Sequence, residues 1–122
     1  MELKVPKVWI ADDDEAIRIV LEEGLNRDGL EIKTFSDGQS LIDALNIDKP
    51  DLIISDIKMP GMHGYDLLKH IKNNYEKLPV IIMTAFTDMQ AAIDSYGGGA
   101  FEYIPKPFDP VSYTHLTLPT NA

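Results

Sequence analysis

Short apolar runs alternate with longer amphipathic stretches along the chain, and this alternation constrains the fold more than any other feature. Runs of four or five residues rich in Val, Ile and Leu are typical of strands buried on both faces of a sheet. Repeated strand–helix units build a parallel sheet, so the pattern predicts a doubly wound, flavodoxin-like α/β fold. We expect its five strands at residues 8–11, 31–35, 52–55, 80–83 and 101–104.

Four helices are expected between these strands. In the first, Ile17, Val20, Leu21 and Leu25 recur at helical spacing, and Gly29 follows the end of the pattern. The other three are expected around residues 41–45, 67–71 and 89–96.

Composition limits what such a domain can do. The 122 residues suffice for one domain, and no apolar run approaches the ~20 residues of a membrane helix. The N-terminus lacks a secretory signal, and the absence of cysteine suits the cytoplasm. A net charge of −9 argues against direct contact with nucleic acid, whose binding depends on neutralising phosphates. We therefore expect a cytoplasmic domain that binds neither membrane nor nucleic acid by itself.

The last dozen residues do not fit the alternating pattern. A helix after residue 110 is needed to cover the sheet beside the first helix, but VSYTHLTLPT contains poor helix formers and a proline. This run resembles an in-frame translation of a sequencing adaptor. We therefore interpret residues 1–110 as the domain and 111–122 as a non-native tail, with the final helix missing or disordered. A genuine short tail is the alternative, and the parent protein is expected to be longer.

Polar residues follow four of the predicted strands. Asp12 and Asp13 follow the first, Asp56 the third, Thr84 the fourth and Lys106 the fifth. Because ligand sites in such sheets lie beyond the carboxyl ends of the strands, we expect these five side chains to converge.

The expected chemistry is phosphoryl transfer to a carboxylate. Three clustered carboxylates repel one another unless a cation intervenes, and Mg²⁺ is the oxygen-seeking cation that would relieve this repulsion. Asp56 is the expected nucleophile, because an aspartate can form an acyl phosphate. Lys106 would neutralise a phosphoryl oxygen, and Thr84 would donate a hydrogen bond to the group.

Each of these residues also has a plainer interpretation. Acidic runs commonly begin helices, so Asp14 or Glu15 is a candidate helix N-cap rather than a metal ligand. Thr84 alone could be a capping hydroxyl, and Lys106 alone a surface charge. Their placement at successive strand ends favours the functional interpretation.

Four segments, IADDDEAIR, LIISDIKMPGMHG, PVIIMTAFTD and AFEYIPKPFD, resemble the receiver domains of two-component response regulators. They are most similar to receivers of the nitrogen-regulation (NtrC-type) class, over residues 7–109. The resemblance implies Asp56 as phosphoacceptor, with Thr84 and Lys106 assisting at the same catalytic site. It implies Thr84 and Tyr103 as switch residues. The implied Mg²⁺ site consists of Asp13, Asp56 and the backbone carbonyl of Lys58 as ligands, with Asp12 acting on the ion through water.

The resemblance also implies a signalling role. A sensor histidine kinase would dock against the first helix near Ile17 and Val20 and phosphorylate Asp56. Thr84 and Tyr103 would then move and change an output surface, which would control transcription in the full-length parent. Receiver dimers are a further expectation. The domain itself would be no enzyme, but a phosphoacceptor that assists its own phosphorylation and dephosphorylation.

Three other function classes were compared with this one. A haloacid-dehalogenase-type phosphatase needs a second acid two residues after the nucleophile, where this chain has Lys58. A nucleotide- or flavin-binding module is disfavoured because neither glycine-rich phosphate-binding motif occurs. A degenerate receiver that serves only as a protein-binding scaffold stays open. So do the roles of Asp14 and of His63, which replaces an acidic residue common in the family motif.

Overall fold

The structure, a computed structural model, describes residues 5–96, 100 and 102–106. Five parallel strands form one sheet in the order β2-β1-β3-β4-β5. This order confirms the doubly wound, flavodoxin-like prediction. The expected tail at 111–122 and the missing final helix lie outside the described residues. The strands are β1 (Lys7–Ala11), β2 (Glu31–Phe35), β3 (Leu52–Asp56), β4 (Val80–Ala85) and β5 (Glu102–Lys106).

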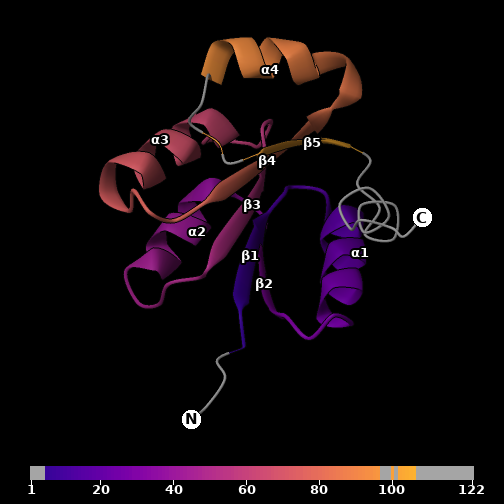
Figure 1. Ribbon diagram of the computed structural model, residues 1–122, viewed down its shortest axis with the longest axis vertical. Helices are drawn as coiled ribbons and strands as arrows, with labels where there is room; N and C mark the ends of the chain where they lie inside the picture. The colour runs from indigo at the N-terminus through magenta and orange to yellow at the C-terminus, as the bar shows by residue number, and fades with distance from the viewer. Residues whose placement is uncertain (1–4, 97–99, 101, 107–122) are drawn as a thin grey trace, which may run out of the picture.

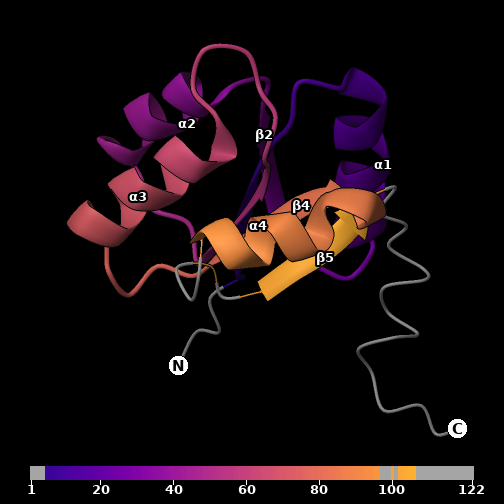
Figure 2. The ribbon, with the colours of Figure 1, turned by 90° about the horizontal axis from the view of Figure 1, so that it is seen from above.

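The four expected helices are present and lie in two layers. Helices α2 and α3 cover one face of the sheet, while α1 lies on the other (Figures 1 and 2). None of the helices in the described part of the chain combines the length and apolar character needed to span a membrane. The helices are α1 (Glu15–Asn26), α2 (Gly38–Leu45), α3 (Gly64–Asn74) and α4 (Met89–Tyr96), with a 3₁₀ turn, η1 (Phe86–Asp88), before α4.

Each face of the sheet has its own apolar core. Successive side chains of a strand point to opposite faces, so β1 sends Trp9 toward α2 and α3 and Ile10 toward α1. Trp9 packs with Leu41 and Leu67 in the first core, and Ile10 packs with Leu21 in the second. Burial on both faces explains why β1 is an unbroken apolar run.

Helix α1 departs in part from the predicted buried stripe. Leu21 is fully buried, and Ile17 and Leu25 are partly buried against the sheet, as the spacing predicted. Val20 is 48% exposed, however, and so is a surface residue together with Ile19. Val20 is therefore accessible to a docking partner, as the expected kinase contact near it requires, whereas Ile17, named in the same expectation, is partly buried.

Two strands extend further than their apolar runs. Thr84 lies within β4, and β5 runs to Lys106 although we expected it to end two residues earlier. Pro105 is tolerated in β5 because β5 is the last strand of the described sheet, and its outer edge needs no ladder hydrogen bond. The register pairs Thr84 with Pro105 and Ala85 with Lys106. Asp56, Thr84 and Lys106 therefore still reach the same edge of the sheet.

Candidate functional site

Three carboxylates meet at the carboxyl edge of the sheet. Asp12 follows β1, Asp56 ends β3, and Asp13 comes next after Asp12. One oxygen from each lies within 4.8 Å of the others, so the three could hold a single metal ion. Asp12 is fully buried and Asp56 is 6% exposed, whereas Asp13 is exposed to solvent. These three residues are called the acidic cluster below.

Lys106 is the positively charged residue that was expected to meet these carboxylates. Its Nζ lies 3.1 Å from Asp12 Oδ2 and 3.1 Å from Asp56 Oδ2. The structure thus brings together the two buried carboxylates and the lysine as predicted. One ammonium group cannot neutralise three carboxylates, so the acidic cluster keeps an excess of negative charge.

A cavity of about 240 Å³, called the Asp56 cavity below, opens beside this contact. Asp56, Thr84 and Lys106 all line it. Thr84 is buried in β4, so its side chain is held by the sheet rather than by a loop. A small group that enters the Asp56 cavity would therefore meet a carboxylate, a hydroxyl and an ammonium group. The remaining lining residues are Ile57, Lys58, Ala85 and Asp88.

The electrostatics of Asp12 show that its charge is incompletely compensated. Burial raises the pKa of Asp12, and the neighbouring charge of Asp56 raises it further, against the lowering effect of Lys106. Asp12 Oδ2 is buried, and Lys106 Nζ lies 3.1 Å from it. Burial acts to lower the pKa of Lys106, but contact with Asp56 and the charge of Asp12 raise it overall. A hard dication with oxygen ligands fits this arrangement of carboxylates.

Asp14 is a helix cap in this structure. Its Oδ1 accepts hydrogen bonds from the Ala16 amide at 2.9 Å and the Ile17 amide at 3.4 Å, which places it at the N-cap of α1. Of the three consecutive aspartates, Asp12 and Asp13 therefore belong to the acidic cluster and Asp14 to the helix.

Gly64 brings α3 against the backbone of Asp56. A Cβ at this position would lie 2.8 Å from the Cα of Ile57 and closer still to the Asp56 carbonyl oxygen. The Gly64 amide donates a 2.7 Å hydrogen bond to the Ile57 carbonyl. No larger residue fits without moving the chain that carries Asp56. Sequence reasoning missed this contact, although the glycine stands in one of the segments used for the family resemblance.

Tyr103, Lys58 and His63 were also named from the sequence, and each lies in a different setting. Tyr103 is partly buried and packs against the core on the α2 and α3 side. The Lys58 Nζ lies 3.7 Å from Asp88, another residue of the Asp56 cavity, and the role of the Lys58 carbonyl as a metal ligand stays a prediction. His63 is exposed at the N-cap of α3 and makes no capping hydrogen bond through its side chain.

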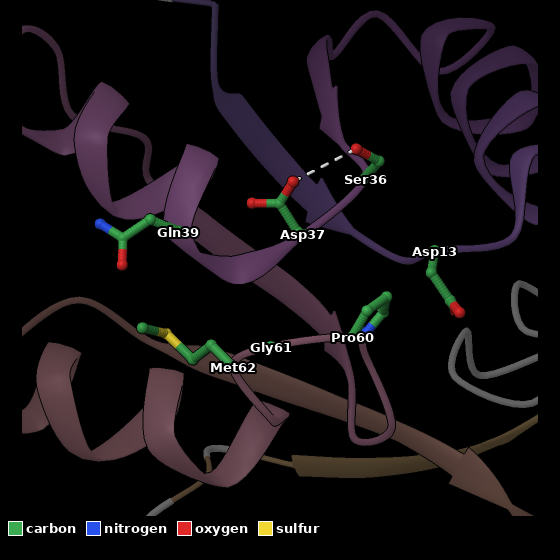
Figure 3. A pocket seen from close by; sticks show the side chains of 7 residues that line it. All are labelled: Asp13, Ser36, Asp37, Gln39, Pro60, Gly61 and Met62. Atoms are coloured by element: carbon green, nitrogen blue, oxygen red, sulfur yellow. Dashed lines mark hydrogen bonds between the residues drawn. The ribbon is translucent and has the colours of Figure 1, made fainter.

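A larger cavity of about 730 Å³ adjoins the acidic cluster at Asp13. Figure 3 shows Ser36, Asp37 and Gln39 along one of its sides and the loop before α3 along the other. Asp56 and Lys106 do not line it, so the predicted chemistry belongs to the smaller Asp56 cavity. The loop contributes Pro60, Gly61 and Met62.

Comparison with known proteins identifies the family. The family described as "Response regulator receiver domain" matches residues 8–116. The chain belongs to this family. The receiver is 54% identical to the DNA-binding transcriptional regulator NtrC of Klebsiella pneumoniae over 101 residues, which cover 83% of this chain and 22% of that relative. It thus spans about a fifth of the length of the curated NtrC relatives that it matches.

Solved structures agree with this assignment. The apo form of the receiver domain of nitrogen regulatory protein C is 50% identical to this receiver, with a TM-score of 0.79, and the match covers 91% of this chain and 90% of that one. Chemotaxis response regulator CheY4 of Vibrio cholerae has a TM-score of 0.84 at 28% identity, covering 93% of this chain and 96% of that one. The predicted NtrC-type resemblance is confirmed.

Proposed function

We propose that this receiver accepts a phosphoryl group on Asp56 from a sensor histidine kinase, with Mg²⁺ bound at the acidic cluster. The observation that carries the proposal is the meeting of Asp56, Thr84 and Lys106 at one small cavity, with Asp56 Oδ2 3.1 Å from Lys106 Nζ. A phosphorylated receiver would then act as a switch within a longer signalling protein.

The acidic cluster provides suitable oxygens for Mg²⁺. Asp12, Asp13 and Asp56 would hold the ion, with the Lys58 carbonyl as a fourth protein ligand, because their excess negative charge favours a hard cation. Bound Mg²⁺ would neutralise charge on phosphoryl oxygens and so lower the barrier to transfer.

The receiver's own side chains perform the remaining steps. A carboxylate oxygen of Asp56 forms a bond to phosphorus while the bond from phosphorus to the kinase histidine nitrogen breaks, and that nitrogen keeps the electron pair. Lys106 Nζ moves from carboxylate contact to a phosphoryl oxygen and stabilises the charge there. The Thr84 hydroxyl donates a hydrogen bond to another phosphoryl oxygen, which holds the product.

Phosphorylation adds roughly −1.5 to −2 charges to the Asp56 cavity. Thr84 would move toward these charges, and β5 lies directly beside β4, with Tyr103 opposite Ile82 in the register. Movement of Thr84 therefore has a short path to Tyr103 and to the surface near α4. This is a shift between two populated states of one fold.

The exposed surface of α1 suggests where the kinase docks, and the names of the relatives suggest the output of the switch. Val20 and Ile19 expose apolar side chains on α1, which suits a helical kinase surface, while Ile17 contributes mainly to the core. The NtrC relatives carry the name of DNA-binding transcriptional regulators. We therefore place this receiver upstream of transcription in a longer parent.

The test is phosphorylation of the purified chain by acetyl phosphate and Mg²⁺, followed by intact mass measurement. We expect a gain of one phosphoryl group for the wild type and none for D56N or for the wild type with EDTA. D28N is a matched control, because Asp28 is an exposed aspartate beyond α1 and distant in sequence from every predicted site residue. It should gain the group as the wild type does.

The same experiment separates the proposal from its main alternative. A folded wild-type chain that gains no mass would be a degenerate receiver that acts only as a protein-binding scaffold. Gain of a phosphoryl group by D56N would move the acceptor to another residue and contradict the assignment.

A further inference from the structure

One side chain outside the predicted site holds the backbone of the acidic cluster. Arg18, at the end of the first turn of α1, donates a 2.6 Å hydrogen bond from Nη1 to the carbonyl oxygen of Asp12. We propose that Arg18 is a positioning residue, which orients the turn that carries Asp12 and Asp13 for Mg²⁺. The inference rests on the proposed metal site and adds a residue that the site did not include.

Asp12 is restrained from several directions. Its amide donates to the Phe35 carbonyl at 3.0 Å, and its Oδ1 accepts from the Asp14 amide at 2.9 Å. Neither of these contacts involves the carbonyl oxygen of Asp12, and it is this oxygen that accepts the hydrogen bond from Arg18. It is therefore the side chain that fixes the orientation of the peptide group between Asp12 and Asp13.

Asp13 depends on this restraint more than Asp12 does. Its side chain is exposed, and among the described residues nothing donates a hydrogen bond to its carboxylate. The direction of its Cα–Cβ bond is therefore set by the backbone on either side. Asp14 fixes the following side by capping α1, and Arg18 fixes the preceding peptide. Without Arg18 the Asp13 carboxylate would sample more directions and meet the metal less often.

The charge of Arg18 and a positioning role predict opposite changes in Mg²⁺ affinity when Arg18 is removed. A guanidinium group near three carboxylates repels a dication, so its charge alone weakens Mg²⁺ binding. Removal of Arg18 would then strengthen binding if charge were its main effect. A positioning role predicts the opposite, because partners that orient metal ligands typically support affinity by about 10-fold or more.

The experiment compares R18M, R18K and R27M with the wild type. Thermal unfolding, followed by fluorescence of the buried Trp9, is measured against MgCl₂ concentration, and each variant is referred to its own metal-free midpoint. This referencing removes any loss of helix stability from the comparison. Arg27 is the only other arginine and lies at the C-cap of the same helix, so R27M is a matched control.

We expect R18M to bind Mg²⁺ about 10-fold more weakly, R18K to recover part of the loss, and R27M to match the wild type. Acetyl phosphate labelling of Asp56 should slow in the same order. Unchanged or tighter Mg²⁺ binding by R18M would overturn the positioning role while leaving the proposed function intact. A wild type that shows no response to Mg²⁺ would overturn the metal site, and the role of Arg18 with it.

Discussion

Lysine and aspartate meet at both ends of this sheet, with opposite results. At the amino end, Lys7 Nζ contacts both oxygens of Asp48, at 2.8 and 3.0 Å. At the carboxyl end, Lys106 Nζ lies between Asp12 and Asp56 at 3.1 Å from each. The two lysines thus have the same partner type at similar distances.

The pKa values separate the two ends. Hydrogen bonding raises the pKa of Lys7 and lowers that of Asp48, so pairing favours both charges. Burial and the charge of Asp56 raise the pKa of Asp12 even though Lys106 is in contact with it. The amino end is a solvent-accessible pair in which each charge is favoured by its partner, and at the carboxyl end two buried carboxylates share one lysine.

This difference shows how one pair of residue types serves two purposes. An exposed ion pair is satisfied by its partner and by water, so it has no need of a further ligand. Buried carboxylates that outnumber their cation store electrostatic repulsion, which a metal ion can relieve on binding. The carboxyl end of the sheet is therefore less stable without a metal ion, and the same repulsion favours binding of one.

The largest expected effect is stabilisation by Mg²⁺. At free Mg²⁺ 100-fold above its dissociation constant, the free energy of unfolding of the wild type should rise by about 2.7 kcal/mol. D12N should lose most of this gain, because it removes a ligand, while D48N should keep all of it. Denaturant unfolding with MgCl₂ and with EDTA measures both. Equal stabilisation of D12N and D48N by Mg²⁺ would contradict the proposal that the ion binds at the carboxyl end of the sheet through Asp12.

A second prediction concerns the metal-free state. Without Mg²⁺, D12N should raise the free energy of unfolding by on the order of 1–2 kcal/mol, because a buried carboxylate in excess becomes neutral. D48N should lower it slightly, because it removes the partner of Lys7. Denaturant unfolding in EDTA at pH 7 measures both changes in the free energy of unfolding and their directions. A destabilised D12N would mean that the contact with Lys106 outweighs burial and repulsion.

A third prediction tests whether every aspartate at the carboxyl edge of the sheet is destabilising. Asp37 lies at this edge too, but its Oδ1 accepts a 2.7 Å hydrogen bond from the Ser40 amide at the N-terminus of α2. This bond lowers the pKa of Asp37 below its ordinary value of 3.8. D37A should therefore cost about 1 kcal/mol of unfolding free energy at pH 7.

The pH dependence of D37A follows from the sign of that shift. A lowered pKa stabilises the fold above 3.8, and this contribution is lost as pH falls through the folded value. The difference between wild type and D37A should shrink on acidification, whereas D37N, which keeps a capping oxygen, should remain near the wild type. An equal loss in D37N and D37A would show that the cap depends on the negative charge rather than on the oxygen, and no loss in D37A would show that the cap contributes little.

Much of this fold was predictable because its strands are buried on both faces. Apolar runs such as those of β1 and β3 stand out from their flanks, and the polar residues that end them mark the carboxyl edge. The convergence of Asp12, Asp56 and Lys106 was predicted from their positions at the carboxyl ends of parallel strands. Their roles in phosphoryl transfer stay predictions.

The misses have local physical causes. Ile17 was expected beside Val20 at the kinase-docking surface, but it packs against the core, because the apolar spacing of α1 does not show which of its positions faces solvent. The extension of β5 through Pro105 was missed because proline ordinarily ends a strand, and only an edge position tolerates it. Contacts of Arg18 and Gly64 with backbone atoms leave no trace in residue spacing.

The smallest expected effect is the contribution of the Lys7–Asp48 pair. The pair is solvent-accessible, with Lys7 partly and Asp48 largely exposed, so D48N should lower the free energy of unfolding less than D37A does. The lowered pKa of Asp48 makes the contribution full above 3.8 and lost below it, while the raised pKa of Lys7 makes it full below 10.5 and lost above it. The difference between wild type and D48N should therefore be largest between these values.

Salt distinguishes this pair from the acidic cluster. Raising NaCl from about 0.05 to 1 M shortens the Debye length to ~3 Å, which screens an exposed pair far more than a buried one. In EDTA at pH 7, the small destabilisation of D48N should vanish at high salt, while the stabilisation of D12N should persist in large part. If both differences faded equally, the carboxyl edge would be as solvated as the amino edge, and burial could not be the reason that one binds a cation and the other does not.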